Sequence, residues 1–174
     1  MKPRQSLCAL FVAAWLVAIC AGAAGATPMS ASTSIYPVGN GARVNDPIPT
    51  PPNAWFGQYY DNMFLQGQPD VFREDAAIDF DWGDGSPDPR ISADYFSVRW
   101  TRTLWLRTGT WRVTTRTDDG VRLWVNQQLV VDNWTDHAPA ENSGLIALQA
   151  GCRYDIRMEY YEHGGGAVAE LLWS

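Results

Sequence analysis

Hydrophobic and polar residues alternate in short runs through most of the chain beyond residue 96. In 111–117, tryptophan, valine and threonine alternate with arginine and threonine, and in 154–161 aromatic and aliphatic side chains alternate mainly with charged ones. A period of two is typical of a β-strand with one buried and one solvated face. No segment carries the period of a long amphipathic helix, and at most one helical turn is expected, within 68–77.

Turn residues separate these runs at short intervals. They are rich in glycine, aspartate and asparagine and lie at 108–109, 118–120, 126–127, 150–151 and 164–166. The runs between them predict strands at 96–106, 111–117, 121–125, 128–134, 143–148, 154–161 and 167–173. Short strands at this spacing indicate an all-β fold, an antiparallel sandwich or barrel.

The first 26 residues have the pattern of an export signal. Lys2 and Arg4 precede an apolar run at 7–24, and small residues at 24–26 offer a cleavage point. A permanent membrane anchor is the alternative, but the apolar run is near the lower limit for crossing a bilayer. We therefore expect a secreted protein that meets the membrane only through its export signal.

The remaining chain divides into a linker and one domain. Residues 27–52 contain six prolines among small and polar residues, a composition with little hydrophobic drive to fold. Large aromatic residues begin at Trp55, so the domain is expected to span 53–174. The full chain has 174 residues, which suits a single domain.

The cysteines add little to this picture. Cys20 follows Ile19, whereas a lipoprotein signal has a small residue in front of its modified cysteine, so secretion is favoured over lipid anchoring at Cys20. Cys152 is the single cysteine after the signal. We interpret it as a small core residue, with an interchain bridge as the alternative.

Charge and composition exclude several functions. The formal net charge of −6 does not suit nucleic acid, whose phosphates require clustered cations. The chain has two histidines and no G-x-S-x-G nucleophile motif, so neither a catalytic triad nor a histidine metal site is indicated. The glycine-rich loop at 83–89 lacks the lysine of a phosphate-binding loop. We therefore expect no enzymatic activity.

The adjacent pair Asp118 and Asp119 is the strongest candidate for chemistry. At a strand end, with Gly120 next to allow unusual backbone dihedrals, the two carboxylates can converge. Hard carboxylate oxygens suit Ca²⁺. The alternative is an Asp-Asp-Gly turn capped by its own side chains, and the residues alone favour that alternative. Asp84 and Asp88, in the glycine-rich loop, are weaker metal candidates.

Tryptophan is abundant, with nine in the chain. Trp111 and Trp173 lie in alternating runs and are interpreted as core residues, whereas Trp124 lies on the face opposite Val121 and its partners. Trp134 stands at the end of a predicted strand. It is therefore the tryptophan expected to be available to a ligand, although packing at the domain edge is the alternative.

Five segments occur in an order that resembles a known family. They read FDWGDGSPDP at 80–89, FSVRWT at 96–101, TDDGVRLW at 117–124, VVDNW at 130–134 and MEYYEHGGGA at 158–167. Together they resemble the PA14 domain over about residues 55–174. The resemblance implies an antiparallel β-sandwich of PA14 type, a module that occurs in glycosidases, adhesins and bacterial toxins.

The resemblance also implies a site. In the yeast adhesin members, two neighbouring aspartates joined by a cis peptide bind Ca²⁺, and the ion accepts sugar hydroxyls; these aspartates correspond to Asp118 and Asp119. Those proteins also use an asparagine from a late loop, whereas the matching segment here, 162–166, has none. Glu162, or alternatively His163, is expected to replace it together with glycine carbonyls of this segment, that of Gly165 among them.

We accordingly expect a secreted carbohydrate-binding module that uses Ca²⁺. Trp134, Tyr161 and His163 are the expected ligand-binding residues around the metal. The alternative function is a non-catalytic structural or protein-interaction module of the cell surface without sugar specificity.

Overall fold

The computed structural model describes residues 54–174, and all regular structure in that part of the chain is β. The strands are β1 (Trp55–Tyr60), β2 (Val71–Asp75), β3 (Asp79–Gly83), β4 (Phe96–Trp105), β5 (Gly109–Asp118), β6 (Val121–Val125), β7 (Gln128–Asn133), β8 (Ala140–Leu148), β9 (Arg153–Glu162) and β10 (Ala167–Trp173). The expected export signal at 1–26, the linker at 27–52 and Cys20 lie outside the described residues.

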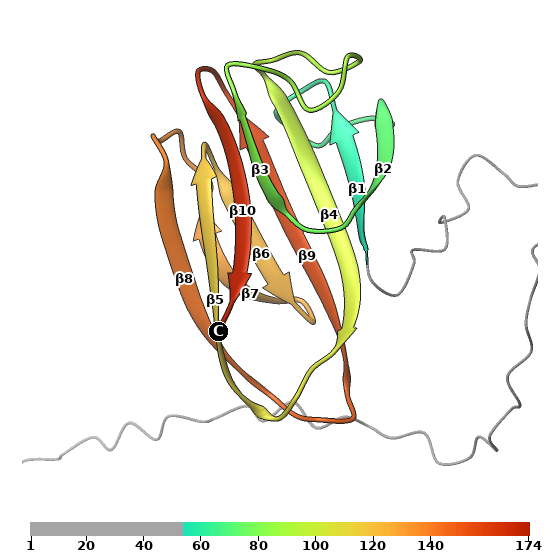
Figure 1. Ribbon diagram of the computed structural model, residues 1–174, viewed down its shortest axis with the longest axis vertical. Helices are drawn as coiled ribbons and strands as arrows, with labels where there is room; N and C mark the ends of the chain where they lie inside the picture. Colours follow the sequence, from blue (N-terminus) through green and yellow to red (C-terminus); the bar gives the residue numbers. More distant parts are fainter. Residues whose placement is uncertain (1–53) are drawn as a thin grey trace, which may run out of the picture. The chain divides into compact units, whose positions relative to one another are not determined.

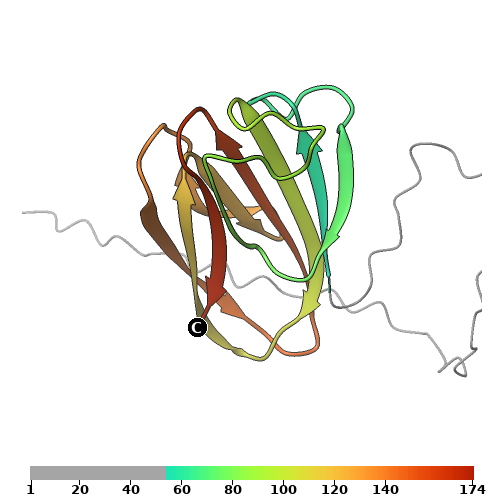
Figure 2. The same cartoon turned by 45° about the horizontal axis from the view of Figure 1, so that its top comes forward.

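The strands form two antiparallel sheets that pack face to face (Figures 1 and 2). One sheet has six strands in the order β2-β1-β4-β9-β6-β7, and the other has four in the order β3-β10-β5-β8. The predicted all-β antiparallel sandwich is therefore confirmed. Among the described residues, no helix is long and apolar enough to cross a membrane.

The core follows from the alternation in the sequence. In β9, Tyr154, Ile156 and Met158 point inward, while charged residues between them face solvent on the outer side of the six-stranded sheet. Aromatic contacts join the two sheets, since Phe80 of β3 stacks on Trp100 of β4 with ring centroids 5.8 Å apart. Cys152 is buried within this core.

The strands after residue 96 lie close to the predicted positions, whereas β1, β2 and β3 were not predicted. The expected helical turn at 68–77 is wrong, because Val71–Asp75 is an edge strand paired with β1. The buried carboxylate of Asp75 accepts hydrogen bonds from the Tyr59 hydroxyl at 2.6 Å and from Trp100 Nε1 at 2.8 Å. These hydrogen bonds hold the polar strand β2 in the sheet, and the composition of that segment gives no indication of them.

Four connections cross from one sheet to the other at the same end of the sandwich, the upper end in Figure 1. The pairing register explains why they meet. On the four-stranded sheet, Asp118 at the end of β5 pairs with Val168 near the start of β10, and Thr117 pairs with Ala140 at the start of β8. The crossing segments are 84–95, 119–120, 134–139 and 163–166. We call this part of the molecule the crossing end.

Candidate functional site: a carboxylate cluster at the crossing end

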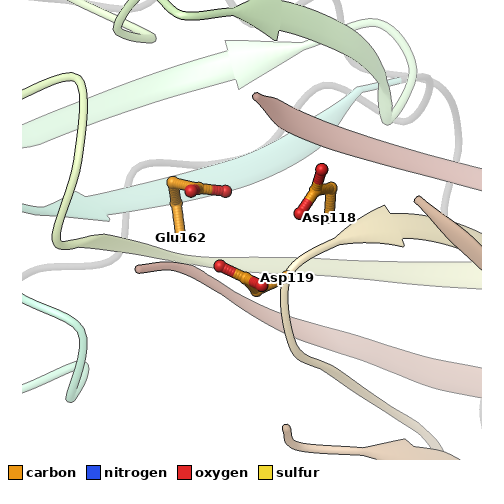
Figure 3. Close-up of side chains that lie close together, drawn as sticks. All are labelled: Asp118, Asp119 and Glu162. Atoms are coloured by element: carbon orange, nitrogen blue, oxygen red, sulfur yellow. The ribbon is translucent and has the colours of Figure 1, made fainter. Parts of the chain in front are cut away.

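Asp118 and Asp119 stand where the chain leaves the four-stranded sheet and enters the six-stranded sheet. β5 ends at Asp118, β6 begins at Val121, and the peptide bond between the two aspartates is cis. In a regular strand, adjacent side chains point to opposite faces. At this corner both carboxylates instead turn toward one space (Figure 3).

Backbone N–H groups from two other crossing segments hold Asp119 in place. The His137 N–H donates to Asp119 Oδ1 at 2.8 Å, and the His163 N–H donates to Oδ2 at 2.9 Å. Asp119 is buried, so these two bonds compensate for part of the hydration that its carboxylate loses. The carboxylate thereby ties segments 119–120, 134–139 and 163–166 together.

Glu162, the last residue of β9, supplies a third carboxylate. One oxygen each of Asp118, Asp119 and Glu162 can be chosen so that all three atoms lie within 4.8 Å of one another. Glu162 is fully buried; the Tyr160 hydroxyl lies 3.1 Å from its Oε2, whereas its Oε1 has no hydrogen-bond partner. A buried oxygen without a partner is costly, so this atom indicates that the cluster accepts a group from outside the chain.

Burial and the neighbouring carboxylates make the ionised forms of Glu162 and Asp118 less favourable. Burial, followed by the charge of Asp119, raises the pKa of Glu162 to about 7. Burial, again followed by Asp119, raises the pKa of Asp118. A cation among these oxygens would reverse both effects, because a nearby positive charge favours the ionised carboxylate. Oxygen-only ligands of this kind suit Ca²⁺ or another hard cation.

Gly120 is required at the corner for a reason other than the one expected from the sequence. Its φ is not in the left-handed region, so unusual dihedrals do not explain it. A Cβ atom built on Gly120 would instead lie 2.2 Å from Cε1 of Tyr161. The missing side chain allows the Tyr161 ring to pack directly against the backbone beside Asp119.

A polar and aromatic rim surrounds the cluster. The Tyr161 hydroxyl donates to Asp136 Oδ1, and His163 Nδ1 lies next to Asp136 Oδ2, both at 2.7 Å. These contacts lower the pKa of Asp136, with the Tyr161 bond as the main cause, and the bond to Asp136 raises the pKa of His163. Trp134 packs edge-on against Tyr161, with ring centroids 4.7 Å apart.

The structure brings together most of the residues singled out from the sequence. Asp118, Asp119 and Glu162 form the cluster, and Trp134, Tyr161 and His163 meet at its rim. Tyr161 is buried and its hydroxyl donates to Asp136, so its ring packs underneath the exposed rim residues and supports them. The metal-ligand role of Gly165 stays a prediction; its N–H donates to Asp94 Oδ1 at 3.2 Å.

The two weaker metal candidates lie elsewhere. Asp88 is bound to Arg90, whose Nε is 2.8 Å from Asp88 Oδ1, and neither Asp84 nor Asp88 belongs to the cluster. Conversely, Asp94, Tyr95 and Asp136 were missed, because they stand in irregular segments whose meeting depends on the pairing of distant strands. A positive φ of 61° at Tyr95 has no signal in the sequence.

The family model of the PA14 domain matches residues 54–174. The chain belongs to the PA14 domain family. The resemblance carried by the five segments, and the cis peptide that it implied between Asp118 and Asp119, are both confirmed. The PA14 fold thus accounts for the corner that brings the aspartates together.

Two relatives of this PA14 domain are anti-sigma factor proteins. The anti-sigma-I factor RsgI3 of Acetivibrio thermocellus is 49% identical over 120 residues, which are 68% of this chain and 18% of RsgI3. A solved anti-sigma factor domain-containing protein is 46% identical with a TM-score of 0.66, over 69% of this chain and 42% of that one. The chain therefore spans less than a fifth of the curated relative and less than half of the solved one.

These relatives correct the expected function. The PA14 sugar-binding domain of an RTX adhesin is 18% identical with a TM-score of 0.60, over 70% of this chain and 89% of that one, so it shares the fold alone. The prediction of a carbohydrate-binding module is wrong, because the proteins with substantial identity are anti-sigma factors. The expectation that the PA14 domain is not an enzyme is confirmed by the same relatives.

Proposed function

We propose that this PA14 domain is a non-catalytic protein-interaction module without sugar specificity, of the kind carried by anti-sigma factor proteins. The observation that carries the proposal is the 49% identity with RsgI3 over 120 residues, a length close to that of the PA14 domain at 54–174. Identity at that level extends beyond the shared fold, whereas the sugar-binding domain compared above is only 18% identical.

The export pattern of residues 1–26 supports a place outside the cytoplasm, with residues 27–52 as the spacer before the domain. In that location the domain would meet a protein of the cell envelope. A sigma factor acts inside the cell, so the proposed partner is a different protein.

We further propose that Ca²⁺ stabilises the crossing end. Asp118, Asp119 and Glu162 would hold the ion, and backbone carbonyls of 163–166 and water would complete its six to eight oxygen ligands. Support comes from the Glu162 carboxylate, which lies close to the two aspartates (Figure 3) and whose buried Oε1 has no partner. In this proposal the ion organises the partner-binding surface and accepts no sugar hydroxyl.

In-cell crosslinking combined with a glycan array tests the function. A photo-crosslinking amino acid would replace Tyr95 at the rim, or Trp105 near the other end of the sandwich as control; the two residues are 58% and 67% exposed. The full chain should form a discrete protein adduct from position 95 and none from position 105, while the glycan array stays blank. Saturable glycan binding that a chelator abolishes would overturn the proposal.

Calorimetric titration of the full chain with calcium tests the ion separately. We expect saturable binding that is lost in Asp119→Asn and kept in Asp155→Asn, a control at an exposed carboxylate on the outer face of β9. Equal binding by both variants would place the ion elsewhere.

A further inference from the structure

The crossing end concentrates negative charge. Besides Asp84 and Asp88, five carboxylates lie in or beside its connecting segments: Asp94, Asp118, Asp119, Asp136 and Glu162. Residues 54–174 contain no lysine, and the one arginine in the four crossing segments, Arg90, is already paired with Asp88. A divalent cation in the cluster would offset two of these five carboxylate charges and leave about three.

Exposed aromatic surface accompanies this charge. The Tyr95 ring is 58% exposed and packs edge-on against His163, with ring centroids 5.3 Å apart. His163 is bonded to Asp136, and Asp94, the neighbour of Tyr95, accepts the N–H of Gly165. The Tyr95 ring and two carboxylates therefore belong to one connected surface made of segments 92–95, 134–139 and 163–166.

Aromatic rings beside carboxylates suit an arginine or lysine side chain. The face of the ring attracts the cation, while each carboxylate accepts charge-assisted hydrogen bonds from its N–H groups. A neutral or acidic ligand would leave the residual charge of this surface uncompensated. At the floor of the site, the partly exposed Asp118 and the unpartnered Glu162 Oε1 also favour a cation.

We propose that the crossing end recognises a basic side chain, arginine or lysine, presented by a protein partner and held by Asp94, Tyr95 and Asp136. This inference rests on the proposed interaction function and names the chemistry of the partner. Calcium would occupy the floor of the site and the basic side chain its rim, so the two bind together.

Three matched peptides test this by NMR titration of the ¹⁵N-labelled full chain in millimolar calcium. They have the sequence acetyl-Gly-Ser-Gly-X-Gly-Ser-Gly-amide, with arginine, glutamine or glutamate at X. The arginine peptide should shift amide signals of 92–95, 134–139 and 163–166 in a saturable manner, and the other two should not. Asp136→Asn and Tyr95→Asn should each weaken this binding about fivefold.

The variants are chosen so that folding is preserved. Asparagine tolerates the positive φ of position 95, and at position 136 it keeps an oxygen for the Tyr161 hydroxyl. Asp155→Asn and Trp105→Ala remove an exposed charge and an exposed ring near the other end, and both should bind the arginine peptide like the unaltered chain.

Other results would overturn the inference. Binding of the glutamate peptide in place of the arginine peptide would show that a partner carboxylate completes the metal site. Absence of arginine-peptide binding, with a protein adduct at position 95 and a blank glycan array, would reject the basic partner and leave the proposed function standing. Glycan binding would reject the proposed function whatever the peptides do.

Discussion

At the crossing end, the positions most sensitive to substitution are those where the surrounding atoms leave little freedom in the choice of side chain. Gly120 is the clearest example, because the Tyr161 ring occupies the space that any side chain would need. Asp119, whose carboxylate joins three segments, directly precedes that glycine. Small changes at these positions should therefore have large effects.

Gly120→Ala should lower the free energy of unfolding by about 1–3 kcal/mol, because a Cβ atom 2.2 Å from Tyr161 Cε1 forces the ring or the corner to move. Urea denaturation of the full chain measures this. Gly109→Ala is the matched control, since the nearest atom to its Cβ is 3.6 Å away, and it should cost less than about 0.5 kcal/mol. Equal stabilities for the two variants would contradict the packing argument.

Glu162 should make stability depend on pH when calcium is absent. Its pKa is about 7 in the folded chain and 4.5 ordinarily, so the folded state binds more protons between these values. The resulting stabilisation is complete below about pH 4.5 and is lost as the pH rises through about 7. Allowing for solvent screening near this end, the loss is on the order of 1–2 kcal/mol.

Glu162→Gln should remove that part of the pH dependence, and Glu141→Gln, at an exposed carboxylate of β8, should keep it. Unfolding free energies measured with a chelator from pH 4 to pH 8 give the comparison. His163 changes stability in the same direction because its pKa is also raised, mainly by its hydrogen bond to Asp136, and this contribution remains in both variants. An unchanged slope in Glu162→Gln would assign the dependence to other groups.

At the scale of elements, the β6–β7 hairpin shows how turn chemistry limits stability. Asn126 and Gln127 form its two-residue turn with φ values of 46° and 67°, as in a type I′ turn. Asn126 suits the turn, because its Oδ1 also accepts the Asp155 N–H at 2.8 Å. Gln127 has no such compensation among the hydrogen bonds of the described residues.

Gln127→Gly should therefore raise the free energy of unfolding by roughly 0.5–1 kcal/mol, since glycine adopts a positive φ without steric cost. Chemical denaturation measures the gain. Gln128→Gly, one residue later at the start of β7, should instead destabilise the chain, because glycine loses more conformational freedom when it is fixed in a strand. A gain at position 128, or a loss at position 127, would refute the assignment of the turn.

The same scale shows what the sequence could predict. From β4 onward, turn residues and runs of alternating or β-favouring residues locate the strands, and the alternation is clearest in β5 and β6, which have one buried and one more exposed face. β2 escaped prediction because Arg73 and Asp75, a pair that reads as solvated, form an ion pair at 2.6 Å with Asp75 buried. Asp118 and Asp119 were found because adjacency is visible in the chain, whereas Asp136 reaches the site only through the connection between β7 and β8.

At the scale of the whole molecule, contacts between β7 and β8 join the two sheets along one side. The Asn133 amide donates to Asn142 Oδ1 at 3.4 Å, and Gly144 of β8 lies directly against the backbone of Val130 in β7. These strands flank segment 134–139, which carries Asp136 and His137 to the crossing end. Close packing of the sheets on this side therefore also positions the rim.

Gly144→Ala should disturb both stability and the rim. Its Cβ would lie 2.2 Å from the Val130 carbonyl oxygen, and because that atom belongs to the backbone, the strands must separate. We expect a loss of about 1–3 kcal/mol. Amide exchange should become faster in β8 and in 134–139. Ser143→Ala, whose side chain points to the opposite face of β8, should leave both measurements nearly unchanged. If Gly144→Ala destabilised the chain without faster exchange in 134–139, the rim would be positioned independently of this side of the sandwich.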